Sequence, residues 1–424
     1  SVVAGGGDVT ISAGLFEVQG SSWDTTVEST NGFAATSNVT INATDVSVNG
    51  STLDSNNVFD ADGRNWTFNL SNSYTQTGGS LTGVRNAFNG AADLSFSATT
   101  VTGQEIFIAG NTLSVSADAT LTTDARGHAA NAGGASTNGG GGGHGGRGGN
   151  GRNASNAGGF NDSTLLPNDF GGGGGSGSRS SGGRGGGRIL AALAGLCEID
   201  GILSSNGAQG GDNSHGALGG GGAGGTIRIK CEIFDGSGLL RANGARGGQD
   251  ASTGGNEDGG GGGGGGGRIV VRSKSSSFTN KAGVQAEPGG ASGGFNPGSA
   301  GGRGTVVFIR IDAGATTTVD DSKADDLDLE VYRSWRWEPA VEGSFDYEKV
   351  LVRADTQVVG GGGDATIDTN LFELENSSWD TTVESTNGFA TASDVTINTV
   401  DMVVTSSTIE MGNSNQWTVN STTS

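Results

Sequence analysis

The sequence is poor in several residue types, with 4 proline, 5 lysine, 3 histidine and 2 cysteine residues among 424. The shortage of proline and the lack of a Gly-X-Y period exclude collagen, although 85 residues are glycine. No run approaches the about 20 apolar residues that a membrane-spanning helix needs. The three histidines, His128, His144 and His215, lie among glycines without metal-ligand spacing, so we expect solvated loop residues.

Positive charge is also scarce, and the formal net charge is −21. Such a charge argues against a nucleic-acid partner and against an anionic membrane surface. Glycine-flanked arginines resemble RNA-binding boxes only superficially, because those boxes are basic. We therefore expect no nucleic-acid partner and no membrane span.

What the sequence does contain is a long internal repeat. The stretch SSWDTTVESTNGFA occurs at 21–34 and again at 377–390, and residues 2–54 align without gaps on 358–410 with 34 of 53 positions identical. The chain is thus one period of 356 residues followed by the opening of the next. This arrangement predicts a unit cut from a tandem array.

The first block, residues 1–126, has strand-like openings at DVTI (8–11), NVTI (38–41), NWTF (65–68) and DLSF (93–96). Each is followed by short alternating runs with small polar corners, which predicts coils of 27–30 residues. We expect an all-β fold without significant helix, a right-handed parallel β-helix (β-solenoid). An antiparallel sandwich is the alternative.

The second block, residues 127–310, combines strands with glycine runs. The apolar residues Ile189, Ile227, Ile269 and Val306 recur at intervals of 37 to 42, which predicts longer coils. Its glycine runs are either flexible linkers or stacked, polyglycine-II-like segments, and we favour stacking because the runs recur at matching points between strands.

An acidic and aromatic segment, residues 311–357, precedes the restart of the repeat at 358–424. We expect it to be a spacer or clasp between periods. Oxygen-rich side chains could hold calcium, but the spacing fits no known calcium loop, and a solvated acidic patch is the favoured interpretation. The weak candidates for such a metal site are Asp320, Asp321, Asp325 and Asp326.

Cys197 and Cys231 fall at points that the coil spacing makes equivalent. Stacking would bring their Cα atoms to about 5 Å, a separation that a disulfide accepts. We expect a disulfide, and an unbridged buried pair is the alternative.

Nine N-x-Ser/Thr sequons are candidate glycosylation sites in a secreted chain. They lie at Asn38, Asn42, Asn49, Asn65, Asn69, Asn153, Asn161, Asn376 and Asn420. Three are lost in the second copy of the repeat, so glycosylation there is not essential.

No catalytic constellation is evident. The acid pair Asp24 and Glu28 is repeated as Asp380 and Glu384, so every period would carry the same groove. Enzymes are rarely built as such arrays, and we expect neither an enzyme nor an organic cofactor.

The pattern GGGRI, ANGxxGG and GGTIRI resembles the glycine-rich parallel β-helix repeats of giant secreted microbial surface filaments and adhesins. The resemblance implies an extracellular or cell-surface protein. We expect a structural unit that binds neighbouring repeats or protomers, and the alternative is an adhesin that recognises glycans or a host surface. The candidate junction residues between repeats are Trp23, Asp24, Trp335, Trp337, Trp379 and Asp380.

Overall fold

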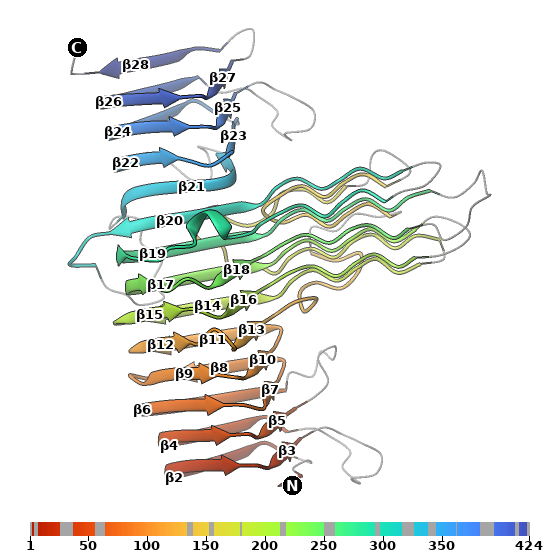
Figure 1. Cartoon of the computed structure of the whole chain (residues 1–424). Helices are drawn as coiled ribbons and strands as arrows, with labels where there is room; N and C mark the ends of the chain where they lie inside the picture. Colours follow the sequence, from red (N-terminus) through yellow and green to blue (C-terminus); the bar gives the residue numbers. More distant parts are fainter. Residues whose placement is uncertain are drawn as a thin grey trace.

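The computed structural model is an elongated all-β molecule (Figure 1). It describes every residue except 1, 4–6, 26–36, 56–63, 134–138, 152–156, 179, 213–217, 250–258, 293–296, 316–325, 338–344, 362, 382–393, 412–414 and 422–424. Within the described residues the one helical element is a single 3-10 turn, η1 (Lys281–Gly283). All other regular elements are strands.

The strands belong to two sheets. The eight-stranded parallel sheet contains β1 (Val2–Val3), β3 (Ser22–Asp24), β5 (Thr52–Asp54), β7 (Ser80–Thr82), β10 (Thr100–Thr102), β13 (Thr120–Thr122), β16 (Ile202–Ser204) and β18 (Leu239–Arg241). The first strands of the twenty-stranded sheet are β2 (Val9–Gln19), β4 (Val39–Asn49), β6 (Asn65–Thr77), β8 (Arg85–Asn89), β9 (Asp93–Ser97), β11 (Glu105–Gly110), β12 (Thr112–Val115), β14 (Arg188–Leu193), β15 (Leu196–Ile199), β17 (Thr226–Asp235) and β19 (Arg268–Ser276). Its remaining strands are β20 (Thr305–Ile311), β21 (Asp326–Trp337), β22 (Phe345–Val352), β23 (Gln357–Gly360), β24 (Ala365–Glu375), β25 (Ser378–Asp380), β26 (Val395–Thr405), β27 (Thr408–Glu410) and β28 (Trp417–Ser421).

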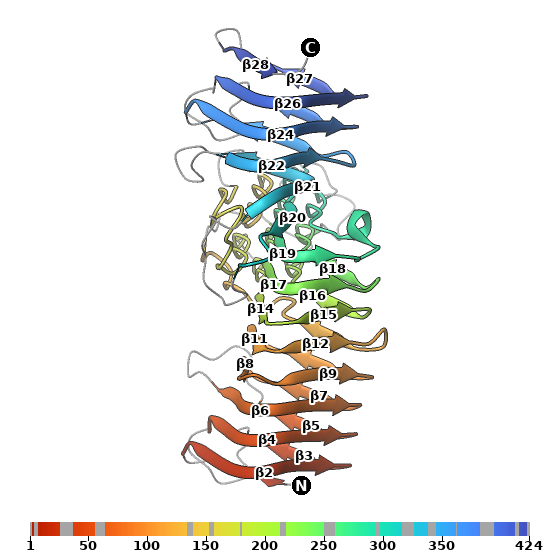
Figure 2. The same ribbon diagram turned by 90° about the vertical axis from the view of Figure 1, so that its left-hand side faces the viewer.

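The chain builds layers that stack along the long axis (Figures 1 and 2). In the first half of the molecule, a layer gives one short strand to the eight-stranded sheet and one long strand, or two short ones, to the larger sheet. Val9 pairs with Val39 and Val39 with Trp66, which confirms the first two coil lengths. The prediction that DLSF (93–96) opens a coil is wrong. β6 pairs its first half with β8 and its second half with β9, so DLSF, which lies in β9, is the second strand of its layer.

Apolar residues that alternate along the strands fill the interior of these layers. Val39, Ile41, Trp66 and Phe68 are fully buried. The anchors Ile189, Ile227, Ile269 and Val306 pair in register on neighbouring strands, as their spacing predicts. We call the layers up to β20 the first column, and their interior is a single apolar cluster.

The glycine runs leave the first column and project sideways from it as a bundle (Figure 1). We call this the glycine bundle, and its described segments are 139–149, 171–175, 182–187, 207–211, 219–225, 242–248, 261–267, 286–290 and 298–304. Backbone hydrogen bonds connect segment 219–225 with six others (139–149, 171–175, 182–187, 207–211, 242–248 and 261–267), whereas a β-strand bonds to two neighbours. A Cβ atom added at Gly220, Gly221 or Gly222 would lie 1.9 Å from a neighbouring carbonyl oxygen. These described glycines are packed segments and not flexible linkers.

Among the described strands, the direction reverses at one place. β20 pairs antiparallel with β21, from Thr305 opposite Arg333 to Ile311 opposite Asp326. Val306 and Phe308 point into the core of the first column, whereas Val307, Ile309 and Ile311 point into a second apolar cluster on the other face. This explains why β20 is apolar at nearly every position, since both of its faces are buried.

We call the layers from β21 to β28 the second column. β22 continues along the line of strands that ends in β20, but its core lies on the opposite side of that sheet. The two columns therefore share the plane of β20 and β21 while their cores lie beside one another.

These findings correct the fold class predicted from the sequence. A right-handed parallel β-helix (β-solenoid) with the glycine runs inside its coils is wrong for this chain. The strands form an eight-stranded parallel sheet and a twenty-stranded sheet that contains an antiparallel pair. The glycine runs form a bundle outside the strand layers, and two apolar clusters replace one continuous interior. No pattern in the sequence indicates the reversal at β20 and β21.

The second copy of the repeat folds like the first. β23, β24, β25, β26 and β27 correspond to β1, β2, β3, β4 and β5, and the pair Ile367 and Ile397 corresponds to Ile11 and Ile41. The ring of Phe372 lies 5.5 Å from that of Trp379, and the ring of Phe16 lies 5.9 Å from that of Trp23. Equal sequence has given equal packing at the two ends of the molecule.

Candidate functional site

The second copy of the repeat is attached to the first period through β21 and β22. We call these two strands, together with the layer of β23, β24 and β25 that they cover, the joint. Residues 328–331 of β21 pair with β22, and residues 334–337 pair with β23. β22 then pairs with β24 in parallel, with Phe345 opposite Ile367 and Val352 opposite Leu374. β21 is thus the strand that connects both columns.

A bend at Arg333 divides the two halves of β21. Arg333 has a left-handed φ of 76°, which is unfavourable for a residue with a Cβ atom. Its guanidinium donates hydrogen bonds to the carbonyl oxygens of Val284 (3.0 Å) and Ala282 (2.7 Å) and lies 3.3 Å from Glu287. These contacts with the first column fix the bend.

Aromatic rings fill the apolar part of the joint. The Trp335 ring lies 5.3 Å from that of Phe345 and 6.0 Å from that of Trp379, measured between ring centroids. Trp379 also contacts Phe372 and Trp417 at 5.5 and 5.2 Å. Trp335 and Trp379 are both buried, and edge-to-face contacts of this kind stabilise a core beyond the area that they bury.

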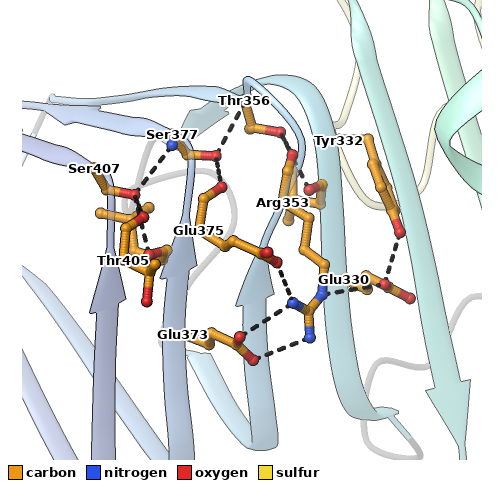
Figure 3. Close-up of polar contacts among 11 residues, drawn as sticks. Glu330, Tyr332, Arg353, Thr356, Glu373, Glu375, Ser377, Thr405 and Ser407 are labelled. Atoms are coloured by element: carbon orange, nitrogen blue, oxygen red, sulfur yellow. Dashed lines mark hydrogen bonds and ion pairs between the residues drawn. The ribbon is translucent and has the colours of Figure 1, made fainter.

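Arg353 is the centre of the polar part of the joint (Figure 3). Its guanidinium makes two hydrogen bonds to the carboxylate of Glu373, at 3.1 and 3.0 Å, and one to Glu375 at 2.6 Å. Its Nε lies 3.6 Å from Glu330, which also accepts a hydrogen bond from the hydroxyl of Tyr332. Burial alone would lower the pKa of Arg353, but these carboxylates raise it above its usual value. Carboxylates of β21 and β24 thus meet at one cation.

Hydroxyl groups continue the joint along its edge (Figure 3). The N–H of Thr356 donates to Ser377 Oγ (3.2 Å), and the N–H of Ser377 donates to Ser407 Oγ (3.1 Å). The first copy has the same contact between the N–H of Ser21 and Ser51 Oγ at 3.2 Å. This ladder connects successive layers through side chains as well as through the backbone.

The acidic segment is mostly a row of ion-pair partners where the structure describes it. Asp326 accepts a 2.6 Å hydrogen bond from Arg272 and both side chains are 2% exposed, while Asp328 lies 2.6 Å from Arg310. A solvated acidic patch is therefore wrong for these residues. Among described residues no group of carboxylates could hold a metal ion, and Asp320, Asp321 and Asp325 lie outside them.

The loop of residues 160–169 connects the glycine bundle with the joint. Arg268 donates to the carbonyl oxygen of Asn161 (3.0 Å) and to Thr164 Oγ1 (3.0 Å), and the Thr164 hydroxyl donates to the carbonyl oxygen of Arg336 (3.2 Å). The guanidinium of Arg336 stacks over the ring of Phe160, 4.4 Å from its centroid. The loop thus lies between the two parts of the molecule and contacts both.

His144 anchors this loop and corrects a prediction. We expected a solvated histidine, but His144 is fully buried, with Nδ1 3.0 Å from the carbonyl oxygen of Gly224 and Nε2 3.5 Å from Asp162. Burial alone would raise the pKa of Asp162, but the contact with His144 and the N–H of Asp169 lower it below its usual value. Glycine runs conceal this burial in the sequence because they resemble loops. His128 is half-buried, and His215 lies outside the described residues.

A pocket of about 270 Å³ opens where the glycine bundle meets the joint. Its walls include Arg147 and Arg303 from the bundle side and Trp335 and Arg336 from β21. Arg303 is 2.9 Å from Asp355. The pocket has a cationic and aromatic lining in a strongly acidic chain.

The two cysteines are buried and not bonded to each other. The expected equivalence is wrong in register, since Cys197 pairs with Phe234 and Cys231 pairs with Ser273. The thiols are nonetheless neighbours, and burial followed by the contact with Cys231 raises the pKa of Cys197 well above its usual value. The described arrangement matches the alternative of an unbridged pair.

Several sequon asparagines belong to ladders between layers. Asn69 Nδ2 donates to Asn42 Oδ1 at 2.8 Å, and Asn420 Nδ2 donates to Asn398 Oδ1 at 2.8 Å. Glycosylation modifies this same nitrogen and replaces one of its two hydrogens, so a single N–H would remain for the ladder bond at Asn69 or Asn420. Asn38, Asn49, Asn65, Asn161 and Asn376 are described at least partly exposed, and Asn153 lies outside the described residues.

The remaining junction candidates are spread over both columns. Trp23 lies in β3 at the start of the first column and contacts Trp66 at 6.0 Å. Asp24 is half-buried in the same strand, and Asp380 is buried in β25. Trp337 pairs through its backbone with Gly360. Most of the repeated stretch, 26–34 and 382–390, lies outside the described residues.

Sequence reasoning missed the arginines. Arg353 follows the apolar run Val350–Val352, and Phe345 pairs with Ile367 at an offset of 22 residues, which places Arg353 opposite Glu375. An alignment of the apolar positions in 345–352 with those in 367–374 at this offset would have identified the pair of Arg353 and Glu375. No such signal exists for Arg333, whose role depends on the reversal at β21.

Comparison with known proteins adds no relative. No family model, no curated protein and no solved structure matches this chain. Among the described residues there is no helix that is long and apolar enough to cross a membrane. The function has to be argued from the joint and the bundle themselves.

Proposed function

We propose that this chain is a structural repeat unit of a tandem extracellular fibre, sheath or cell-surface appendage, and that it is not an enzyme. The observation that carries the proposal is the joint. The end of one period covers the first layer of the next with paired strands, buried tryptophans and a shared arginine. Each period thus contains both partners of a contact that can be repeated.

The rest of the molecule supports a mechanical role. Stacked strands connect each layer to the next by backbone hydrogen bonds, and the glycine bundle is held together by backbone contacts alone over large parts of its length. A net charge of −21 keeps neighbouring fibres apart in solution. Partners would be neighbouring repeats, and the sequons are consistent with an extracellular setting.

Electron microscopy of concatenated chains tests this function. Proteins with one, two and three periods ahead of residues 358–424 should form rods that lengthen by a constant increment per period, with layers spaced about 4.8 Å apart. The control carries Val350→Asp in every period and should lose the regular increment. Compact particles, or beads without a fixed spacing, would overturn the proposal.

A second candidate is an adhesin that binds acidic glycans, and the pocket of Arg147, Arg303 and Arg336 favours it. Trp335 itself is 1% exposed, so it cannot serve as an open platform for a sugar ring. A glycan array probed with the full chain and with Arg147→Gln tests this role. Equal signals for the two proteins would rule out the pocket as the binding site.

A further inference from the structure

The first layers of the two copies of the repeat differ in whether another described strand covers them. In the second copy, β24 pairs with β22 on one edge and with β26 on the other. In the first copy, β2 pairs with β4, and no other described strand pairs with it. An eleven-residue strand with one open edge is a template for another strand.

Apolar side chains report the same difference. Ile367, Phe372 and Trp379 are fully buried, whereas among their equivalents Ile11 is half-buried and Phe16 and Trp23, although buried, keep 9% and 8% exposure. The clearest case is Leu15, which is 58% exposed while its equivalent Leu371 is half-buried under β22. The first layer thus exposes the apolar groups that the joint covers in the second copy.

The glutamates of the two layers differ in the same way. Glu373 is bound by Arg353 through two hydrogen bonds. Its equivalent, Glu17, is exposed and has no described cation within ion-pair distance. The first layer therefore presents one half of the ion pair on which the joint depends.

The residues in these contacts are retained between the copies. Positions 11, 15, 16, 17 and 23 carry the same residues as 367, 371, 372, 373 and 379. Two contact positions differ, with Val18 against Leu374 and Gln19 against Glu375, so the first copy keeps one of the two β24 carboxylates that bind Arg353 in the joint. Both copies thus share the apolar residues Ile, Leu, Phe and Trp and one carboxylate at the positions that the joint contacts.

We propose that the open edge of β2, with its neighbours β1 and β3, is a docking site for a second copy of β21 and β22. The incoming β22 would add a parallel strand with its Phe345 opposite Ile11 and its Val352 opposite Val18. Its Arg353 would bind Glu17, and its Trp335 would cover Trp23. The biological setting of this contact, a preceding period of the same array, rests on the proposed function.

The experiment adds the covering strands to the intact chain. A copy of residues 326–356 is placed before Ser1, so that Thr356 precedes Ser1 as it precedes Gln357 in the natural sequence. Hydrogen exchange of the β2 amides should slow by roughly tenfold or more, toward the rate of β24. The matched control carries Val350→Asp and Val352→Asp in the added copy only and should leave β2 exchange unchanged.

A disulfide tests the register of docking. Leu351→Cys in the added copy should link to Glu17→Cys, because Leu351 pairs with Glu373 in the joint and paired Cα atoms are close enough for a disulfide. Leu15→Cys, two residues away on the same side of β2, should not link. Unchanged β2 exchange, equal protection by the control, or equal linkage at both positions would overturn the proposal.

These results are separable from those on the fibre. Protection of β2 without regular rods would leave the docking site standing and overturn the proposed function. Regular rods from chains whose added strands leave β2 unprotected would do the reverse.

Discussion

Trp379 in the joint and its equivalent Trp23 are the same residue in the same layer and differ in what covers them. Trp23 and Trp379 have the same neighbours within the layer, and only Trp379 has Trp335 above it. A comparison of the two tryptophans therefore measures how much the covering ring of Trp335 adds to the free energy of unfolding.

Trp379→Ala should lower the free energy of unfolding of the second column by about 3–5 kcal/mol, the range for a fully buried aromatic residue. Trp23→Ala should cost less, since Trp23 lacks the covering ring. Urea denaturation combined with hydrogen exchange of β24 to β27 measures both. Equal losses would show that Trp335 adds nothing to the packing of Trp379.

Glu105 gives a pH dependence to the first column. Burial would raise its pKa, but the hydrogen bonds and charges of Arg188 and Arg85 lower it below the ordinary value of 4.5. A carboxyl with a lowered folded-state pKa stabilises the fold above its unfolded pKa, and this contribution is lost as the pH falls through the folded pKa. The melting temperature should thus fall below pH 4.5, with a shallower fall for Glu105→Gln. An identical pH profile would contradict the assignment.

At the scale of elements, the glycine bundle differs from the sheets in what holds it together. Its glycines have no side chains to pack, and at most of them a neighbouring carbonyl oxygen occupies the place where a Cβ atom would lie. Order in the bundle is therefore sensitive to a methyl group added at these packed positions.

Gly289→Ala places a Cβ atom 1.9 Å from the carbonyl oxygen of Ala245, whereas Gly290→Ala meets nothing within 4 Å. The first change should cost about 1–3 kcal/mol by overpacking, and the second should be nearly neutral. Thermal unfolding of the two variants compares adjacent positions in one segment. Similar melting temperatures would show that the bundle rearranges freely.

The sequence predicts the elements better than their assembly. Alternation gave the strands and the registers of Ile189, Ile227 and Ile269, because these depend on local patterns and spacing. The reversal at β20 and β21 was missed, since antiparallel pairing needs no distinctive residue. The buried His144 was missed because glycine neighbours do not reveal what packs around them.

Of the candidate site, the sequence indicated Trp335 and Trp379 but not why they matter. Their contact depends on the pairing of β21 with β23, which spacing alone does not define. The sequence predicts a solvated patch for the acidic residues Asp326 and Asp328 because their partners, Arg272 and Arg310, lie 54 and 18 positions earlier in the chain.

At the scale of the whole molecule, the two cores should unfold separately. Val350→Asp places an unpaired charge in the second core, where Val350 is 1% exposed. Amides of β24 and β26 should then exchange rapidly, while those of β11 and β14 keep their protection. Leu351→Asp, on the half-exposed face of the same strand, should have a smaller effect. Loss of protection throughout the chain would show one cooperative unit.

The sideways position of the second core has a consequence for force. Two stacked sheets are separated by about 10 Å, so an array joined in this way would step sideways by about that distance at every period. Tension on its ends would not act along one line, and each joint would experience a bending moment. The antiparallel pair of β20 and β21, the contacts of Arg333 with the first column and the loop of residues 160–169 would resist that moment together.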